Sequence, residues 1–132
     1  MNPLLPLLFQ YNRQLTAALN EALRPYGLFS AQWSIVYYLH RSGAQSLTQI
    51  WQTLAVEAPT VTRTVTRLEK LGWVMRVEGR DRREKIITLT PNAQQQMPAI
   101  KQAVQQFEQQ AVSQLTVEEQ KTLQALIEKM RG

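Results

Sequence analysis

Apolar positions recur every three or four residues in the first part of the chain, a spacing typical of helices that bury one face. Pro25 and Gly27 are expected to end the first helix and Gly43 the second, because both residue types disfavour a helix interior. Ser30 is expected to cap the start of the second helix, and Ser46 to be the first residue of the third. The pattern therefore predicts helices over about residues 4–24, 30–42 and 46–54.

The stretch that follows Pro59 has the composition of a strand, because threonine and valine dominate it. As a strand it would place valines and arginines on the same face, which is a poor surface to bury. As a helix it brings Val61, Val65 and Leu68 together and turns the threonines and arginines away from them. Pro59 suits the first helical position and Gly72 suits the end, so we predict a helix here.

Two runs of strand-like composition come next, over residues 73–78 and 84–89. The second run is rich in isoleucine, threonine and leucine, which favour a pleated, half-buried surface. The link between the runs is short and polar, and it contains Gly79. We therefore predict a β-hairpin with a cationic tip.

The last part of the chain has the pattern of two helices. Thr90 and Pro91 form a capping residue and a first-turn proline, and Pro98 is expected to kink the helix that they open. The apolar residues of this helix recur at spacings of four and three, which is a heptad seam for packing along another helix: Ala93, Met97, Ile100, Val104, Phe107 and Ala111. Thr116 and Glu119 have capping-box spacing, so a final helix is expected to follow them.

The predicted fold class is therefore mainly α with a small β wing. At 132 residues the chain is expected to form a single domain with a proper core. The net charge is +5, and an excess of four positive charges lies within residues 30–90, where the polar helix and the hairpin fall. This clustering favours an anionic partner, and the two elements together suggest double-stranded DNA.

Several functional classes are disfavoured by the composition. The chain has no cysteine, which excludes disulfides and a thiol redox switch, and its single histidine, His40, is not enough for a metal site. We expect no cofactor and no enzyme activity, because no nucleophile–base set or phosphate-cradling glycine loop is present. The apolar start lacks a basic leader and is too short to span a membrane, so we expect a cytoplasmic protein.

Three stretches, taken in order, resemble the MarR family of bacterial transcription regulators. Residues 56–63, VEAPTVTR, resemble the entry to the recognition helix of that family, and residues 68–76, LEKLGWVMR, resemble its exit into the wing. Asp81-Arg82-Arg83 followed by Leu89-Thr90 resembles the wing signature of the family. The resemblance implies a winged helix-turn-helix lobe over residues 30–90, flanked by dimerisation helices in residues 1–29 and 91–132.

The outward face of the polar helix supplies the expected DNA contacts. Arg63 and Thr60 are expected at base edges, because arginine can pair two donors with guanine and threonine can bond a base or touch a thymine methyl. Thr62 and Thr66 flank that face, and Arg67 is expected at a phosphate. In the hairpin, the resemblance implies that Arg83 enters the minor groove. Phosphate contacts are expected from Arg80 and Arg82, and Asp81 is expected to orient a wing arginine.

The resemblance also implies a homodimer that presents two recognition helices to a pseudo-palindromic operator. The heptad seam and the leucine-rich start of the chain agree with this, because both need a surface to cover them. Members of the family commonly release DNA when a small aromatic or phenolic molecule binds. The candidates for such a pocket here are Tyr11, Trp33, Tyr37 and Tyr38.

The leading hypothesis is a ligand-responsive, sequence-specific repressor. Two alternatives remain open. A sequence-neutral architectural DNA binder would use the same charge without preferring one duplex. A winged-helix module that binds another protein would show an apolar or acidic recognition face, which the threonines and arginines of the polar helix do not match.

Overall fold

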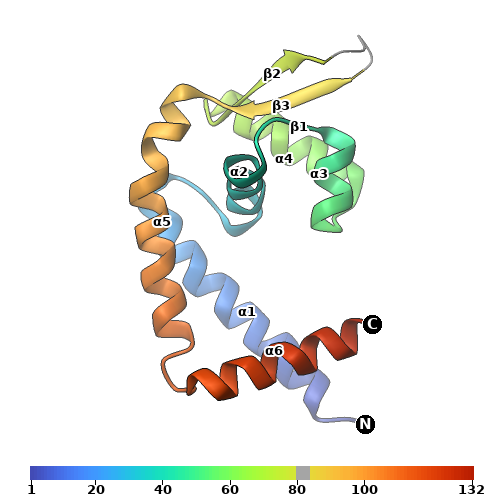
Figure 1. The fold of residues 1–132 in the computed structure, drawn as a ribbon, viewed down its shortest axis with the longest axis vertical. Helices are drawn as coiled ribbons and strands as arrows, with labels where there is room; N and C mark the ends of the chain where they lie inside the picture. The colour runs from blue at the N-terminus through green and yellow to red at the C-terminus, as the bar shows by residue number, and fades with distance from the viewer. Residues whose placement is uncertain (80–83) are drawn as a thin grey trace.

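The computed structural model describes residues 1–79 and 84–132 and contains a small sheet among helices (Figure 1). Its elements follow the predicted order, and most ends differ from the predicted ones by one or two residues. They are α1 (Leu4–Leu23), η1 (Arg24–Tyr26), α2 (Ser30–Ser42), β1 (Gln45–Ser46), α3 (Leu47–Leu54), α4 (Ala58–Lys70), β2 (Val74–Glu78), β3 (Lys85–Leu89), α5 (Pro91–Ala111) and α6 (Val117–Arg131). The predicted fold class is confirmed.

The sheet has three antiparallel strands in the order β1-β3-β2. The predicted pair is present, with Val74 opposite Leu89 and Glu78 opposite Lys85. The third strand, β1, pairs Gln45 with Ile87 and was not predicted. Its two residues are too few to carry a period-two pattern, so its pairing depends on where α2 and α3 place it.

The start of α2 differs from the prediction. Ser30 is the first residue of the helix, and the capping position is Phe29. The backbone N–H groups at this end of the helix bond to side-chain amides. Phe29 N–H donates to Gln32 Oε1 at 2.9 Å, and Ser30 N–H donates to Asn20 Oδ1 at 2.8 Å. An amide from α1 therefore performs the role expected of the serine hydroxyl.

One continuous hydrophobic core joins the helices to the sheet. In α4, Val61, Val65 and Leu68 are all buried, which confirms that this segment separates its apolar and polar side chains as a helix. The strands contribute Val74 and Ile87 from β2 and β3. Because buried residues of α2 and α5 belong to the same cluster, the sheet, α4 and the long helix share a single core.

The heptad seam of α5 is divided between two environments. Ala93, Met97 and Ile100 are fully buried in the core of the chain itself, whereas Phe107 and Ala111 are only half-buried. Pro98 lies inside the helix, and Figure 1 shows the first turns of α5 inclined to the rest. Most of the seam is therefore used within one chain, and only its end remains for other contacts.

The last helix, α6, leaves the end of α5 and runs apart from the sheet and α4 (Figure 1). Its predicted capping box is present, with Glu119 N–H donating to Thr116 Oγ1 at 3.1 Å and Thr116 N–H donating to Glu119 Oε1 at 2.9 Å. No residue of α6 is buried. No helix in the described part of the chain is long and apolar enough to cross a bilayer.

Thr90 connects the wing to α5. Its Oγ1 accepts from Ala93 N–H at 3.1 Å, which caps the helix, and it donates to the Gly72 carbonyl at 2.7 Å. Thr90→Val is expected to lower the free energy of unfolding by about 2 kcal/mol, because one cap and one hydrogen bond are removed together. Urea unfolding followed by circular dichroism at fixed protein concentration checks this. Thr90→Ser keeps the hydroxyl, so an equal loss in both variants would contradict this role.

Candidate nucleic-acid interface

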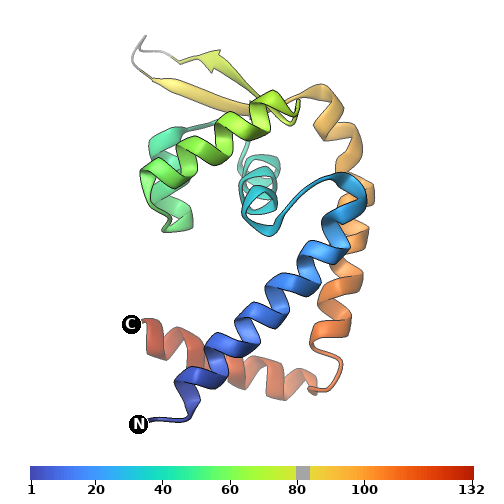
Figure 2. The ribbon, with the colours of Figure 1, turned by 180° about the vertical axis from the view of Figure 1, so that it is seen from behind.

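The outer face of α4 is polar and cationic. Figure 2 shows α4 along one side of the molecule, with the β2–β3 hairpin beside it. Opposite the buried valines, Arg63, Arg67 and Lys70 are exposed, and none of the described elements covers them. Thr62 is exposed as well, whereas Thr60 and Thr66 are half-buried at the margins of this face. The five side chains predicted on this helix therefore lie on one accessible side of it.

The threonines of α4 bond to their own helix. Thr62 Oγ1 donates to the Ala58 carbonyl at 3.0 Å, and Thr66 Oγ1 donates to the Thr62 carbonyl at 2.8 Å. Thr64 makes the same bond to the Thr60 carbonyl at 2.9 Å, on a side that is partly buried. These bonds to the residue four earlier hold each side chain in one rotamer.

Arg63 is oriented by a neighbour one turn earlier. Its Nη2 lies 3.4 Å from Thr60 Oγ1, a long hydrogen bond in which the guanidinium donates. Among residues 1–79 and 84–132 the guanidinium has no second partner, so its remaining N–H groups can point outward, as a bidentate contact to a guanine edge requires. Thr60 and Arg63 therefore form one unit on the outer face of α4.

An ion pair connects the hairpin to the end of α4. Arg76 Nε on β2 donates to Glu69 Oε1 on α4 at 3.3 Å. Both side chains are partly exposed, so the pair contributes little to stability and mainly sets how the strand leaves the helix. Sequence reasoning did not single out this pair, because its members are on different elements.

The predicted wing contacts cannot be placed in the same way. The four residues concerned lie outside the described part of the chain: Arg80, Asp81, Arg82 and Arg83. The orienting role expected of Asp81 is therefore not tested either.

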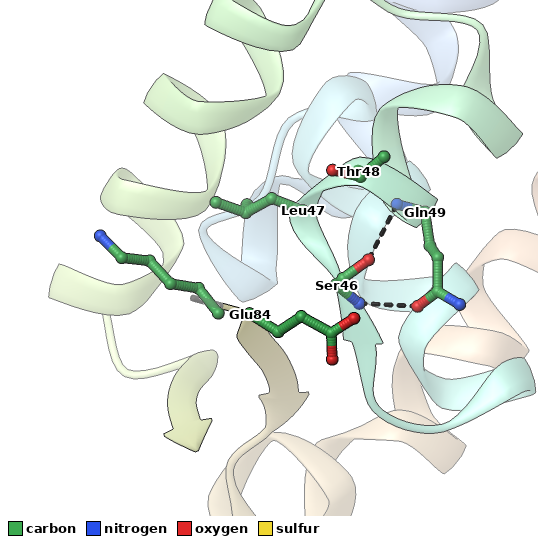
Figure 3. Close-up of a pocket in the computed structure, with 6 residues that line it drawn as sticks. Ser46, Leu47, Thr48, Gln49 and Glu84 are labelled. Carbon is green, nitrogen blue, oxygen red and sulfur yellow. Dashed lines mark hydrogen bonds between the residues drawn. The ribbon is translucent and has the colours of Figure 1, made fainter. Parts of the chain in front are cut away.

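A hollow of about 500 Å³ lies between the first turn of α3 and the start of β3 (Figure 3). Ser46 caps α3 together with Gln49, whose N–H donates to Ser46 Oγ at 3.1 Å. Glu84 and Lys85 line the opposite side. The spacing of Ser46 and Gln49 is a sequence signal for this capping box. Because a carboxylate faces the hollow beside the lysine, we place the anion-binding surface on α4 and not here.

Three of the four aromatic candidates for a ligand pocket lie together. The rings of Trp33 and Tyr37 on α2 stack with centroids 5.4 Å apart. Tyr38 lines the same hollow of about 310 Å³, which α3 closes from the other side. Its hydroxyl is engaged in the fold, 3.1 Å from Gln45 Oε1 and 3.2 Å from Thr53 Oγ1. Trp33 and Tyr37 are thus the better candidates for a ligand.

Tyr11 lies elsewhere, in a separate hollow between α1 and α5 that also contains Phe107. Its hydroxyl is 3.5 Å from the Ala111 carbonyl. The structure therefore does not bring all four predicted aromatic residues into one pocket.

Comparison with known proteins places the chain in a family. The model of the MarR family matches residues 28–85. The HTH-type transcriptional regulator YwoH of Bacillus subtilis is 43% identical over 104 residues, which are 79% of this chain and 76% of that protein. A mutant MarR from E. coli complexed with operator DNA superposes with a TM-score of 0.91 at 28% identity, covering 97% of this chain and 93% of that one. Wild-type MarR in its apo form gives 0.79 at 27% identity, covering 98% of each chain. The chain belongs to the MarR family of transcriptional regulators.

Proposed function

We propose that this protein is a homodimeric repressor that binds a pseudo-palindromic operator and is released by a small aromatic ligand. The observation that carries the proposal is the outer face of α4, where Arg63, Arg67 and Lys70 stand exposed beside threonines. Such a face on the second helix of a helix-turn-helix fits the major groove. Action on chromosomal DNA would take place in the cytoplasm.

The arrangement of the whole chain supports DNA binding. It superposes on the MarR chain complexed with operator DNA with a TM-score of 0.91 over 97% of its length, so its elements lie much as they do in a chain that has bound an operator.

The two ends of the chain support a dimer. Their helices leave large apolar side chains exposed by about 40% or more: Leu4, Leu5, Leu7, Phe9 and Tyr11 on α1, and Leu123, Leu126, Ile127 and Met130 on α6. A second copy related by a two-fold axis would cover both sets at once. The dimer would also set the spacing of the two α4 helices at about one turn of DNA.

The stacked Trp33 and Tyr37 support an aromatic effector, because they form one wall of the hollow between α2 and α5 as well. Lys101 lines that hollow together with Glu108, so the lining offers a cation and an acceptor to a phenol and does not select strongly for an anion. We expect 4-hydroxybenzoate to quench the fluorescence of Trp33, and Tyr37→Ala to weaken its binding roughly three- to ten-fold through loss of a ring partner. Tyr11→Phe is the control, and Trp33→Phe should remove the signal. Unchanged affinity in Tyr37→Ala would place the effector elsewhere.

The experiment that tests the function is selection of duplexes from a random pool, followed by fluorescence anisotropy across a salt series. Enrichment of a pseudo-palindrome that is bound at physiological salt, and that blocks transcription in vitro from a promoter carrying it, is the expected result. Equal, steeply salt-dependent binding to all duplexes would indicate the architectural alternative. If the protein bound no duplex at all, the remaining alternative would be a winged-helix module that binds another protein.

A further inference from the structure

We infer that Thr62 and Thr66 recognise thymine through its 5-methyl group, an inference that rests on the proposed function. Each hydroxyl has a single proton, and both give it to a helix carbonyl, at 3.0 Å for Thr62 and 2.8 Å for Thr66. Neither side chain then has a donor to offer a base edge. What remains on the outer side is a γ-methyl group and the lone pairs of the oxygen.

This chemistry suits one base above the others. In the major groove, guanine presents two acceptors, which a hydroxyl without a free proton cannot satisfy. Thymine presents a methyl group, which makes an apolar contact with a threonine methyl. Adenine and cytosine present an amino group that could donate to the lone pairs of a threonine oxygen. The valine variants described below test for that contact. Because their protons are used within the helix, the two hydroxyl groups cannot donate to guanine, and the methyl groups beside them favour thymine.

The positions of the two threonines define where those thymines would be. They are four residues apart on one stripe of α4, which is roughly 6 Å along the helix axis. This length spans about two base-pair steps of 3.4 Å. Arg63 lies next to the stripe, and its guanidinium is the group suited to guanine. The expected half-site therefore has thymines flanking a guanine contact.

Thr64 provides an internal control. Its hydroxyl makes the same bond, to the Thr60 carbonyl at 2.9 Å, but this bond is partly buried, whereas the bonds of Thr62 and Thr66 are exposed. A structural effect of removing a threonine methyl from this helix should appear at Thr64 as well. An effect on base recognition should appear only at Thr62 and Thr66.

The test uses uracil, which pairs like thymine but lacks the methyl group. Each thymine of the selected operator is replaced in turn by deoxyuridine in both half-sites, and affinity is measured by anisotropy. We expect the wild type to lose about four-fold per half-site at the contacted positions, since one buried methyl is removed. Thr66→Ser, or Thr62→Ser at the other position, should bind the thymine and uracil operators equally. Thr64→Ser should keep the wild-type ratio.

Valine variants separate the methyl from the oxygen. Thr66→Val keeps a γ-methyl, so it should keep both the affinity for the thymine operator and the uracil sensitivity. A loss of affinity for the thymine operator itself would mean that the oxygen accepts from a base amino group, which overturns the inference. An enriched operator without any uracil effect, or an effect that persists in both serine variants, also overturns the inference and leaves the proposed function standing. Failure to enrich any sequence would overturn both. Thermal melting of each variant confirms that the comparison is between folded proteins.

Discussion

Arg63→Ala is expected to weaken binding to the selected operator at least about 30-fold, while binding to a scrambled duplex falls much less. A bidentate contact between arginine and guanine discriminates by about 1–3 kcal/mol, and a two-fold dimer would make it in both half-sites. Thr60 holds one nitrogen of the guanidinium at 3.4 Å, so the side chain is already directed before DNA arrives. Anisotropy titrations on both duplexes measure the two losses separately.

Two controls separate base recognition from charge. Arg24→Ala removes the same charge from an exposed pair with Glu21 on α1, and it should leave both affinities nearly unchanged. Arg67→Ala removes an exposed cation of α4 and should weaken both duplexes alike, lowering the salt slope by about one for each phosphate that is no longer neutralised. If Arg63→Ala also weakened both duplexes equally, Arg63 would bind a phosphate and would not read bases.

The elements with a strong period could be predicted from the sequence. Helix α4 is the clearest example, because its composition favours a strand while its spacing favours a helix. Val61, Val65 and Leu68 are all buried, so burial decided between the two. Burying three apolar side chains contributes roughly 5–9 kcal/mol, whereas the six threonines and valines of α4 together cost at most about 4 kcal/mol in helix propensity.

The features that depend on contacts between distant segments could not be predicted. Strand β1 exists because Gln45 meets Ile87 across the fold, and the start of α2 is capped by Asn20 from another helix. Tyr11 is an aromatic residue like the other candidates for a ligand pocket, yet it lines a different hollow. In each case the sequence identifies a group that can interact, while tertiary packing determines its partner.

The same distinction applies to the face of α4. Spacing alone places Arg63, Thr62 and Thr66 on one side of the helix. It does not show whether the hydroxyl protons are free, and this depends on rotamers that the structure specifies. The wing residues remain predictions from the resemblance, because they lie outside the described part of the chain.

Leu126→Glu is expected to abolish the dimer at micromolar concentration and, with it, specific DNA binding. Leu126 is 54% exposed on a helix that buries no residue within the chain. In a two-fold interface the substitution occurs twice, and each copy loses apolar burial and brings a carboxylate into an apolar surface. A loss of about 2 kcal/mol or more per copy would raise the dissociation constant of the dimer at least about 1,000-fold. Analytical ultracentrifugation over a concentration series measures it.

Ala125→Glu is the matched control, because it introduces the same carboxylate one residue away on the opposite face of α6. It should leave both the dimer and operator binding intact, and circular dichroism should show equal helix content in the two variants. A dimer that survives Leu126→Glu would move the interface away from α6 and leave its apolar face without a function. A monomeric variant that still bound the full operator tightly would instead show that one α4 is sufficient, because half-site coupling would then contribute nothing.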